Sequence, residues 1–124
     1  MIEQTIKVPD AGHPITIERN PQRVVVFAAG KVIADSERAL ILREADQASV
    51  FYIPRRDVAM DALQRSQLAS YCPYKGEASH FGLSDGARRG DDVAWTYDAP
   101  YWAVAELENH LAFNPSGVDR IEVR

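Results

Sequence analysis

The segment from residue 71 to residue 77 concentrates side chains that could do chemistry. It reads Tyr-Cys-Pro-Tyr-Lys-Gly-Glu and places the single cysteine of the chain, Cys72, three residues before Lys75. A thiolate is the reactive form of cysteine, and a nearby ammonium group favours it. If a turn brings Cys72 and Lys75 together, the two form a candidate nucleophile with its activator. The alternative is a buried cysteine that packs as a small hydrophobic residue.

Lys75 also has more than one interpretation. In a functional site, its ammonium group binds an anionic ligand or forms a Schiff base. Otherwise the aliphatic part of the side chain lies on the strand and the ammonium group reaches water. In an extended chain Lys75 and Glu77 share one face, which makes Glu77 a possible ion partner. The opposite face is nearly bare and permits close approach of a ligand. That face carries Gly76, Ala78, His80 and Gly82.

Two further pairs of residues are candidate ligand contacts. Trp95 and Tyr97 alternate along a predicted strand, where their rings either line a pocket or pack in the core. Arg38 and Glu44 fall on one strand face about 20 Å apart, so they do not pair directly. They either line a cavity or reach solvent at the strand ends. The candidate ligand-binding residues are therefore Tyr71, Lys75, Trp95, Tyr97, Arg38, Glu44 and His80.

Metal and cofactor chemistry has no motif in this chain. The histidines His13, His80 and His110 are scattered, and a single cysteine excludes a zinc site built mainly from thiolates. His80 would serve as a base for Cys72 only if the chain folds back. The sequence contains no glycine-rich phosphate loop, nucleophile elbow or paired-carboxylate motif. We therefore expect neither a metal nor a cofactor.

Charge and hydropathy exclude other classes of partner. The net charge of −4 over 124 residues disfavours binding to nucleic acid, which requires clustered Lys and Arg. We interpret the arginine pairs at 55–56 and 88–89 as solvated loop charges. No segment approaches the roughly 20 apolar residues that span a bilayer, and the amino terminus has no apolar signal core. We expect a cytoplasmic protein that does not bind membranes.

Short β-branched and aromatic runs must supply the elements that position these side chains. They predict strands at residues 15–18, 24–27, 32–35, 39–42, 50–53, 75–82, 93–97 and 118–123. The first half would form an antiparallel meander, with 24–27 and 32–35 as a hairpin. Apolar spacing predicts short helices at 57–64 and 103–111, and the polar residues 84–91 predict a hairpin loop.

These elements predict one mainly β domain at residues 13–124, preceded by an amino-terminal arm at residues 1–12. Its core would be a bent antiparallel sheet or half-open barrel with two short helices at the rim.

Several motifs resemble a small bacterial family known as domain of unknown function 427, over nearly the whole chain. The most specific is the segment at 71–76, followed by the tryptophan and tyrosine at 95 and 97. The other matching residues are 32–36 followed by 38–39, 52–54 with 57–58, Ala78, Ala94, Pro100 and 112–113.

This resemblance implies a compact fold related to the β-tent group, some of whose members bind zinc through paired Cys-x-x-Cys knuckles. The single cysteine here means that such a zinc site does not carry over. Sulfoxide reductase activity, known in the same group, does not carry over either. Some family members are labelled nucleotidyltransferases, but this chain has no pair of aspartates with metal-binding spacing and no glycine-serine phosphate motif that would support that activity.

The leading functional hypothesis is a domain that binds a small polar or anionic ligand in one pocket. Lys75 would supply charge, and Trp95 and Tyr97 would supply stacking area. One alternative is an enzyme that uses Cys72 as nucleophile or redox thiol with Lys75 as activator. A second alternative is a protein-interaction module that uses a sheet edge or the loop at 55–56.

Overall fold

Two antiparallel sheets make up the fold in a computed structural model that describes residues 4–84 and 92–124. The larger sheet has seven strands in the order β1-β4-β5-β9-β8-β7-β6. Its strands are β1 (Ile15–Arg19), β4 (Leu40–Glu44), β5 (Val50–Pro54), β9 (His110–Phe113), β8 (Ala94–Tyr97), β7 (Gly76–Leu83) and β6 (Leu63–Cys72). The smaller sheet has the order β10-β2-β3, with β10 (Arg120–Val123), β2 (Val24–Ala28) and β3 (Lys31–Ser36).

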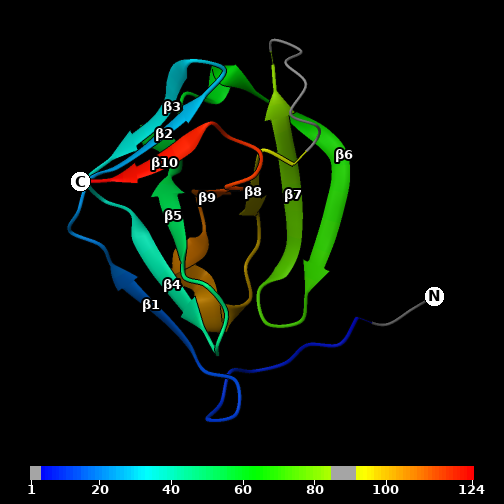
Figure 1. Ribbon diagram of the computed structural model, residues 1–124. Coiled ribbons are helices and arrows are strands. Elements are labelled where there is room, and N and C mark those ends of the chain that lie inside the picture. The colour runs from blue at the N-terminus through cyan, green and yellow to red at the C-terminus, as the bar shows by residue number, and fades with distance from the viewer. Residues whose placement is uncertain (1–3, 85–91) are drawn as a thin grey trace.

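The larger sheet is strongly bent. Figure 1 shows it curving from β1 and β4 on one side, through β5, β9 and β8, to β7 and β6 on the other. The smaller sheet covers one end of this curve. The sheet does not close, because β1 and β6 remain its two edges. The prediction of a mainly β fold with a bent, open antiparallel sheet is confirmed.

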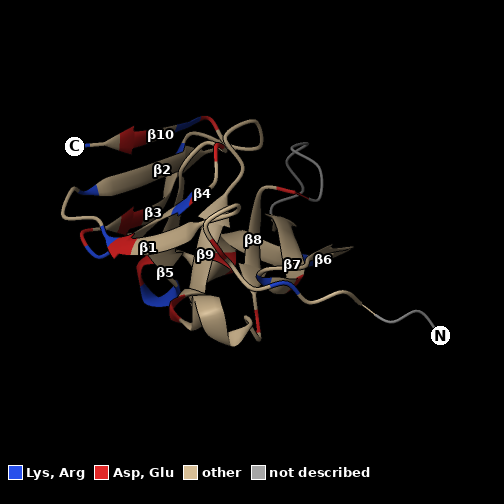
Figure 2. Cartoon of the chain, turned by 90° about the horizontal axis from the view of Figure 1, so that it is seen from below, with Lys and Arg blue, Asp and Glu red and all other residues tan. Residues whose placement is uncertain are grey.

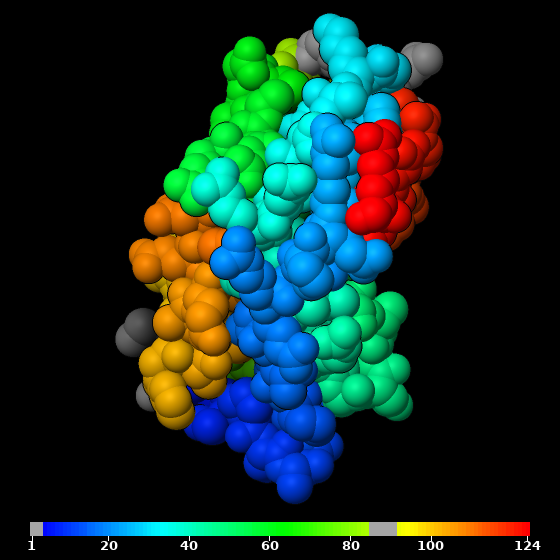
Figure 3. Space-filling model, turned by 90° about the vertical axis from the view of Figure 1, so that its left-hand side faces the viewer, coloured from blue at the N-terminus to red at the C-terminus, as the bar shows by residue number. Residues whose placement is uncertain are grey.

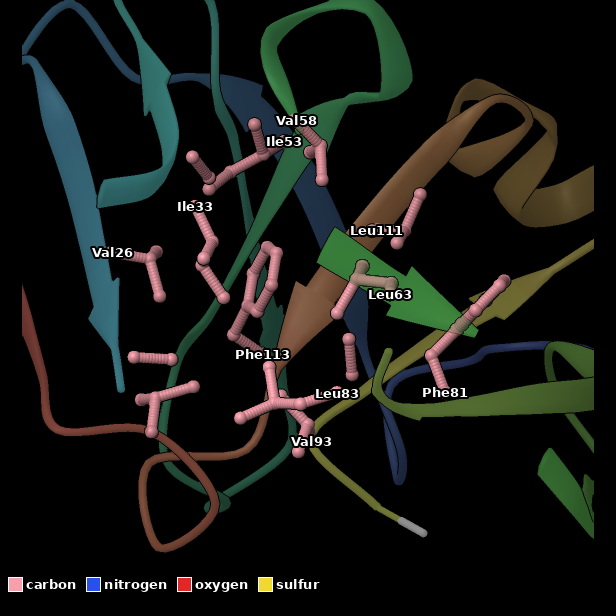
Figure 4. Packing of buried hydrophobic residues seen from close by; sticks show 14 of the residues in the cluster. Val26, Ile33, Ile53, Val58, Leu63, Phe81, Leu83, Val93, Leu111 and Phe113 are labelled. Atoms are coloured by element: carbon pink, nitrogen blue, oxygen red, sulfur yellow. The ribbon is translucent and has the colours of Figure 1, made fainter. Parts of the chain in front are cut away.

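The first hydrophobic cluster fills the space between the two sheets. Figure 4 shows side chains from the small sheet, including Val26 and Ile33, meeting Ile53, Leu111 and Phe113 of the large sheet. Val26 and Leu111 have no exposed surface. Full burial of such a side chain contributes about 1.5–3 kcal/mol, so this cluster is the main source of stability joining the sheets.

The second hydrophobic cluster lies on the opposite face of the large sheet. Strand alternation produces it: Tyr52 and Ala112 face this cluster, whereas their neighbours Ile53 and Leu111 face the first. Two fully buried residues of the 3-10 helix η3 (Trp102–Leu107), Val104 and Leu107, pack against it. The sheet face with the candidate site residues is thus partly covered by η3.

Helices are the main difference from the sequence predictions. The segment predicted as a helix at 57–64 contains parts of two 3-10 turns, η1 (Arg55–Asp57) and η2 (Met60–Ala62), and the start of β6. The segment predicted at 103–111 contains η3 and the start of β9. The helix predictions were based on apolar residues spaced three or four positions apart. A 3-10 turn followed by a strand gives the same spacing.

The strand pairing of the first half also differs from the predicted meander. The hairpin of β2 with β3 is present, but β1 pairs with β4 and not with its neighbour β2. The hairpin loop predicted at residues 84–91 lies almost entirely outside the described residues.

Residues 4–9 run as an extended segment along the end of the molecule that carries the 71–77 segment, and a turn at residues 10–13 follows. Figure 3 shows this amino-terminal segment in dark blue at the base of the molecule. The Lys7 amide donates to the Pro73 carbonyl at 2.9 Å, and the Tyr71 hydroxyl donates to the Thr5 carbonyl at 2.6 Å. The His13 and Tyr74 rings stack with centroids 4.1 Å apart.

Each helical segment within residues 4–84 and 92–124 is too short to cross a lipid bilayer.

Candidate functional site

A cavity of about 310 Å³ opens on the face of the large sheet that carries the second cluster. This volume is at the lower end of the range for sites that bind small molecules. Apolar, aromatic and charged side chains contribute to its wall. They are Leu42, Glu44, Gln47, Ala48, Val50, Tyr52, Ser70, Lys75, His80, Asp92, Trp95 and Tyr97.

A buried ion pair forms one wall. Lys75 follows a turn in which its amide donates to the Cys72 carbonyl at 3.2 Å, and this turn directs the side chain inward. The Lys75 ammonium donates to Oε1 of Glu44, the last residue of β4, and only 8% of Lys75 and 5% of Glu44 is exposed. The His13 ring donates from Nε2 to Oε2 of Glu44 at 2.6 Å. The partner of Lys75 is therefore Glu44 and not Glu77, which is exposed.

The two donors keep the Glu44 carboxylate ionised. Burial alone would raise the pKa of Glu44, but the hydrogen bonds from Lys75 and His13 outweigh burial and hold that pKa below its usual value. The ammonium charge is compensated in the same way. The cavity therefore presents an internally neutralised pair and not a free cation.

Three aromatic residues from two strands form the next wall. The Trp95 Nε1 donates to the Tyr52 hydroxyl at 3.3 Å, and the two rings meet edge to face with centroids 6.5 Å apart. Burial raises the pKa of Tyr52 to about 12 and raises the pKa of Tyr97 well above its usual value. Both hydroxyls are therefore protonated at neutral pH, and the Tyr52 hydroxyl accepts from Trp95.

The Tyr97 hydroxyl is a shielded polar group of the cavity with unused hydrogen-bonding capacity. Only 7% of Tyr97 is exposed, and its hydroxyl makes no hydrogen bond within residues 4–84 and 92–124. No fully enclosed polar side-chain atom in the same residues lacks a partner. The hydroxyl oxygen is therefore reachable from the cavity, where a ligand or water would satisfy it.

Three polar residues that the sequence does not group together complete the wall. The Ser70 Oγ lies 2.8 Å from Nε2 of His80, and the His80 Nδ1 lies 2.7 Å from Oδ1 of Asp92. We call this hydrogen-bonded set the triad. His80 is among the candidates selected from the sequence, but Ser70 and Asp92 are not. Strand pairing could have revealed Ser70, because β6 and β7 pair Ser70 with Ala78, which puts His80 diagonally next to it.

Cys72 is brought close to the cavity but does not line it. It is partly buried and packs against the second cluster. The ammonium of Lys75 pairs with Glu44, and no hydrogen bond joins it to Cys72 within residues 4–84 and 92–124.

Tyr71 and Arg38 lie elsewhere. The Tyr71 hydroxyl contacts Tyr101 at 2.8 Å as well as the amino-terminal segment. Arg38 precedes β4, at the end opposite Glu44, and its guanidinium lies 3.5 Å from a carboxylate oxygen of Asp57.

Arg38 lines a second and larger cavity of about 900 Å³, together with Arg19, Arg55 and Arg56. This cavity is a wide surface groove. Figure 2 shows that basic and acidic residues are both distributed over the described chain. We take the smaller cavity as the candidate site, because Lys75, Glu44 and His80 in its wall are buried and held by hydrogen bonds.

Within residues 4–84 and 92–124, no three His, Cys, Asp or Glu side chains gather as a metal ion would require.

Comparison with known proteins supports the resemblance drawn from the motifs. The family described as a domain of unknown function (DUF427) matches residues 16–124, which include every strand of both sheets except the first residue of β1. No curated protein matches the chain. The chain therefore belongs to the DUF427 family of domains of unknown function.

Proposed function

We propose that this protein binds a small, uncharged, polar ligand with a planar group in the cavity between Lys75 and Tyr97. The observation that carries the proposal is the Tyr97 hydroxyl, a buried donor with no partner among the described residues that is reachable from the cavity. A ligand carbonyl that accepts from this hydroxyl in place of water would gain the net value of one hydrogen bond, about 0.5–1.5 kcal/mol.

The charges of the cavity favour a neutral ligand over an anion. The Lys75 ammonium is already paired with Glu44, and Asp92 adds a second carboxylate to the wall. An anion that draws Lys75 away from Glu44 would cost that buried carboxylate one of its two donors and leave His13 as the other. A neutral amide or carbonyl compound meets no such cost.

The aromatic residues favour a planar ligand. Trp95 is partly exposed in the wall of the cavity, while Tyr52 holds its indole N–H. The indole ring is thereby fixed in orientation before a ligand arrives, and a fixed side chain loses little conformational entropy on binding. A flat ring of the size that fits about 310 Å³ has a preformed apolar surface to pack against.

A fluorescence titration tests the proposal. The chain has two tryptophans, and 78% of Trp102 is exposed, so W102F leaves Trp95 as the only indole reporter. We expect benzamide to change the Trp95 emission saturably and benzoate, the matched anion, to bind more weakly. In the same background, Y97F should weaken benzamide binding by about 3- to 10-fold, since it removes one hydrogen bond.

The control is Y74F, because Tyr74 stacks on His13 and does not line the cavity. It should leave the benzamide affinity unchanged. Tighter binding of benzoate than of benzamide, or equal binding to wild type and Y97F, would contradict the proposed ligand class and the role of Tyr97.

A further inference from the structure

The triad has the connectivity of a nucleophile, a general base and an orienting carboxylate. Ser70 Oγ, His80 Nε2, His80 Nδ1 and Asp92 Oδ1 form one chain with oxygen–nitrogen distances of 2.8 and 2.7 Å. All three side chains line the cavity described above. Acyl-transfer enzymes on unrelated folds are recognised by this geometry and these roles, and not by sequence spacing.

The framework holds each member of the triad in place. Ser70 and His80 lie on adjacent strands, β6 and β7, where a diagonal cross-strand contact joins them. His80 is only 8% exposed, so packing limits the orientations that its ring can take.

Asp92 is fixed by Asn114, whose Nδ2 donates to the Asp92 carbonyl at 3.1 Å and to Oδ2 at 3.3 Å. The Asn114 amide is itself oriented, because its Oδ1 accepts from both the backbone and the hydroxyl of Ser116.

The hydrogen bonds define a direction for proton transfer. With the Asp92 carboxylate accepting from His80 Nδ1–H, the lone pair of Nε2 faces the Ser70 hydroxyl. Ser70 belongs to the edge strand β6 and is exposed, so a substrate can approach its oxygen. The imidazole is positioned to accept a proton, and the hydroxyl is positioned to attack.

We propose that the triad hydrolyses small carboxylic esters that occupy the cavity, with Ser70 as nucleophile and His80 as general base; this inference rests on the proposed ligand pocket. Ser70 Oγ forms a bond to the ester carbonyl carbon while its proton passes to His80 Nε2. The carbon–alkoxy bond then breaks, and the leaving alkoxide takes that proton. Water attacks the acyl-serine through the same base, which releases the carboxylic acid and restores the Ser70 hydroxyl.

The cavity also holds a donor for the oxyanion formed during attack. The Tyr97 hydroxyl is protonated, shielded and unengaged within the described residues. A preorganised donor of this kind stabilises charge that develops on the carbonyl oxygen. The same hydroxyl that we assign to ligand binding thus acts on the substrate carbonyl.

Two probes test the proposal on the intact protein. Hydrolysis of p-nitrophenyl acetate is followed by release of p-nitrophenolate, and phenylmethanesulfonyl fluoride marks a reactive serine by peptide mass mapping. We expect wild type to be sulfonylated at Ser70 and to turn over the ester. S70A should lose the labelling, and both S70A and H80Q should turn over the ester at least about 100-fold more slowly.

The matched control is S79A, which removes a serine from the neighbouring strand. The Ser79 Oγ donates a hydrogen bond to Oδ2 of Asp98 at 2.8 Å, and Ser79 does not line the cavity. S79A should retain both labelling and turnover. Benzamide titration of the W102F protein, run in parallel, separates the two proposals.

If benzamide binds but S70A turns over the ester as fast as S79A, or if the label lies on another residue, the triad proposal is overturned and the pocket proposal stands. If benzamide does not bind and the ester is not hydrolysed, both are overturned.

Asp92 acts through His80 as a positioning residue, and its test uses a spectroscopic readout. The ¹⁵N shifts of the His80 ring report which nitrogen carries the proton. Wild type should show Nδ1–H, and D92N should shift the population toward Nε2–H and reduce labelling of Ser70. An unchanged tautomer with unchanged labelling would overturn the role of Asp92.

Discussion

The ion pair of Lys75 with Glu44 is the residue-level feature on which the candidate site depends most. Both groups are buried, and Glu44 also accepts from His13. A buried pair adds little net stability over an apolar pair of the same volume, but removal of one partner strands the other charge. The pair therefore fixes where Lys75 points and keeps the cavity electrically neutral.

Replacement of Glu44 by glutamine tests this role. E44Q leaves the Lys75 ammonium buried without a counter-charge, so we expect the free energy of unfolding to fall by about 3 kcal/mol. Urea denaturation at neutral pH measures the change. E77Q, an exposed glutamate after the same turn, should change it by less than about 0.5 kcal/mol. Similar losses in both variants would contradict a special role for Glu44.

The stability difference between wild type and E44Q should depend on pH. The pKa of Glu44 is depressed in the folded protein, so its contribution is present above the unfolded value of about 4.3 and is lost as the pH falls through the folded pKa. The difference between the two proteins should therefore shrink as the pH falls below about 4.3. Urea denaturation over this range would refute the assignment if the difference stayed constant.

Much of the cavity could be predicted from the sequence at the residue scale. Lys75, Glu44, Trp95, Tyr97 and His80, selected for their chemistry, all line it. The sequence could not show that Lys75 pairs with Glu44, because Glu44 lies on a strand 31 positions away in sequence. Asp92 falls between a predicted loop and a predicted strand, and nothing in its spacing from His80 indicates a contact.

At the scale of elements, the start of β7 depends on one glycine. Gly76 has φ of +109°, a conformation that other residues rarely adopt, and it pairs with Cys72 where β6 turns into β7. A Cβ there would also lie 3.4 Å from the Ala99 carbonyl oxygen. The glycine that ends the 71–76 motif therefore has a backbone role, and it sets the direction in which Lys75 leaves the turn.

We expect G76A to destabilise the protein by about 1–3 kcal/mol, because alanine would be strained in the backbone conformation that Gly76 adopts. G12A is the control: Gly12 does not have a positive φ, and the atom nearest to an alanine methyl group at this position would be 3.4 Å away. Thermal unfolding should show a lowered midpoint for G76A alone. Equal midpoints for the two variants would contradict the requirement for glycine at position 76.

Most strands with one buried face were predicted, but the edge strand β6 and the central strand β9 were missed. β5 and β2 are recognisable from their β-branched and aromatic residues. β6 is not, because most of its central residues are exposed and polar, so no alternation marks it. It is defined by pairing with β7, which only the folded sheet provides.

At the scale of the whole molecule, the large sheet separates a structural face from the face with the cavity. The first cluster joins the two sheets, and the second lies beneath the candidate site. Local patterns predict the strands but not this arrangement, because the pairing of β1 with β4 skips the intervening β2–β3 hairpin.

Two fully buried leucines distinguish these faces. Leu111 belongs to the first cluster and Leu107 to the second, and neither has exposed surface. Substitution of either by alanine should lower the free energy of unfolding by about 2–5 kcal/mol. Only L107A should also weaken benzamide binding, because Leu107 packs in the cluster that supports the cavity wall. If L111A weakened benzamide binding and L107A left it unchanged, the division of the two faces would be contradicted.

The most direct test of the central claim is a crystal structure of the protein soaked with benzamide. We predict that the ring packs on Trp95 and that the carboxamide oxygen accepts a hydrogen bond from the Tyr97 hydroxyl, with the Lys75–Glu44 pair intact. Benzamide bound only in the groove lined by Arg19 and Arg38, with the smaller cavity empty or closed, would contradict the claim.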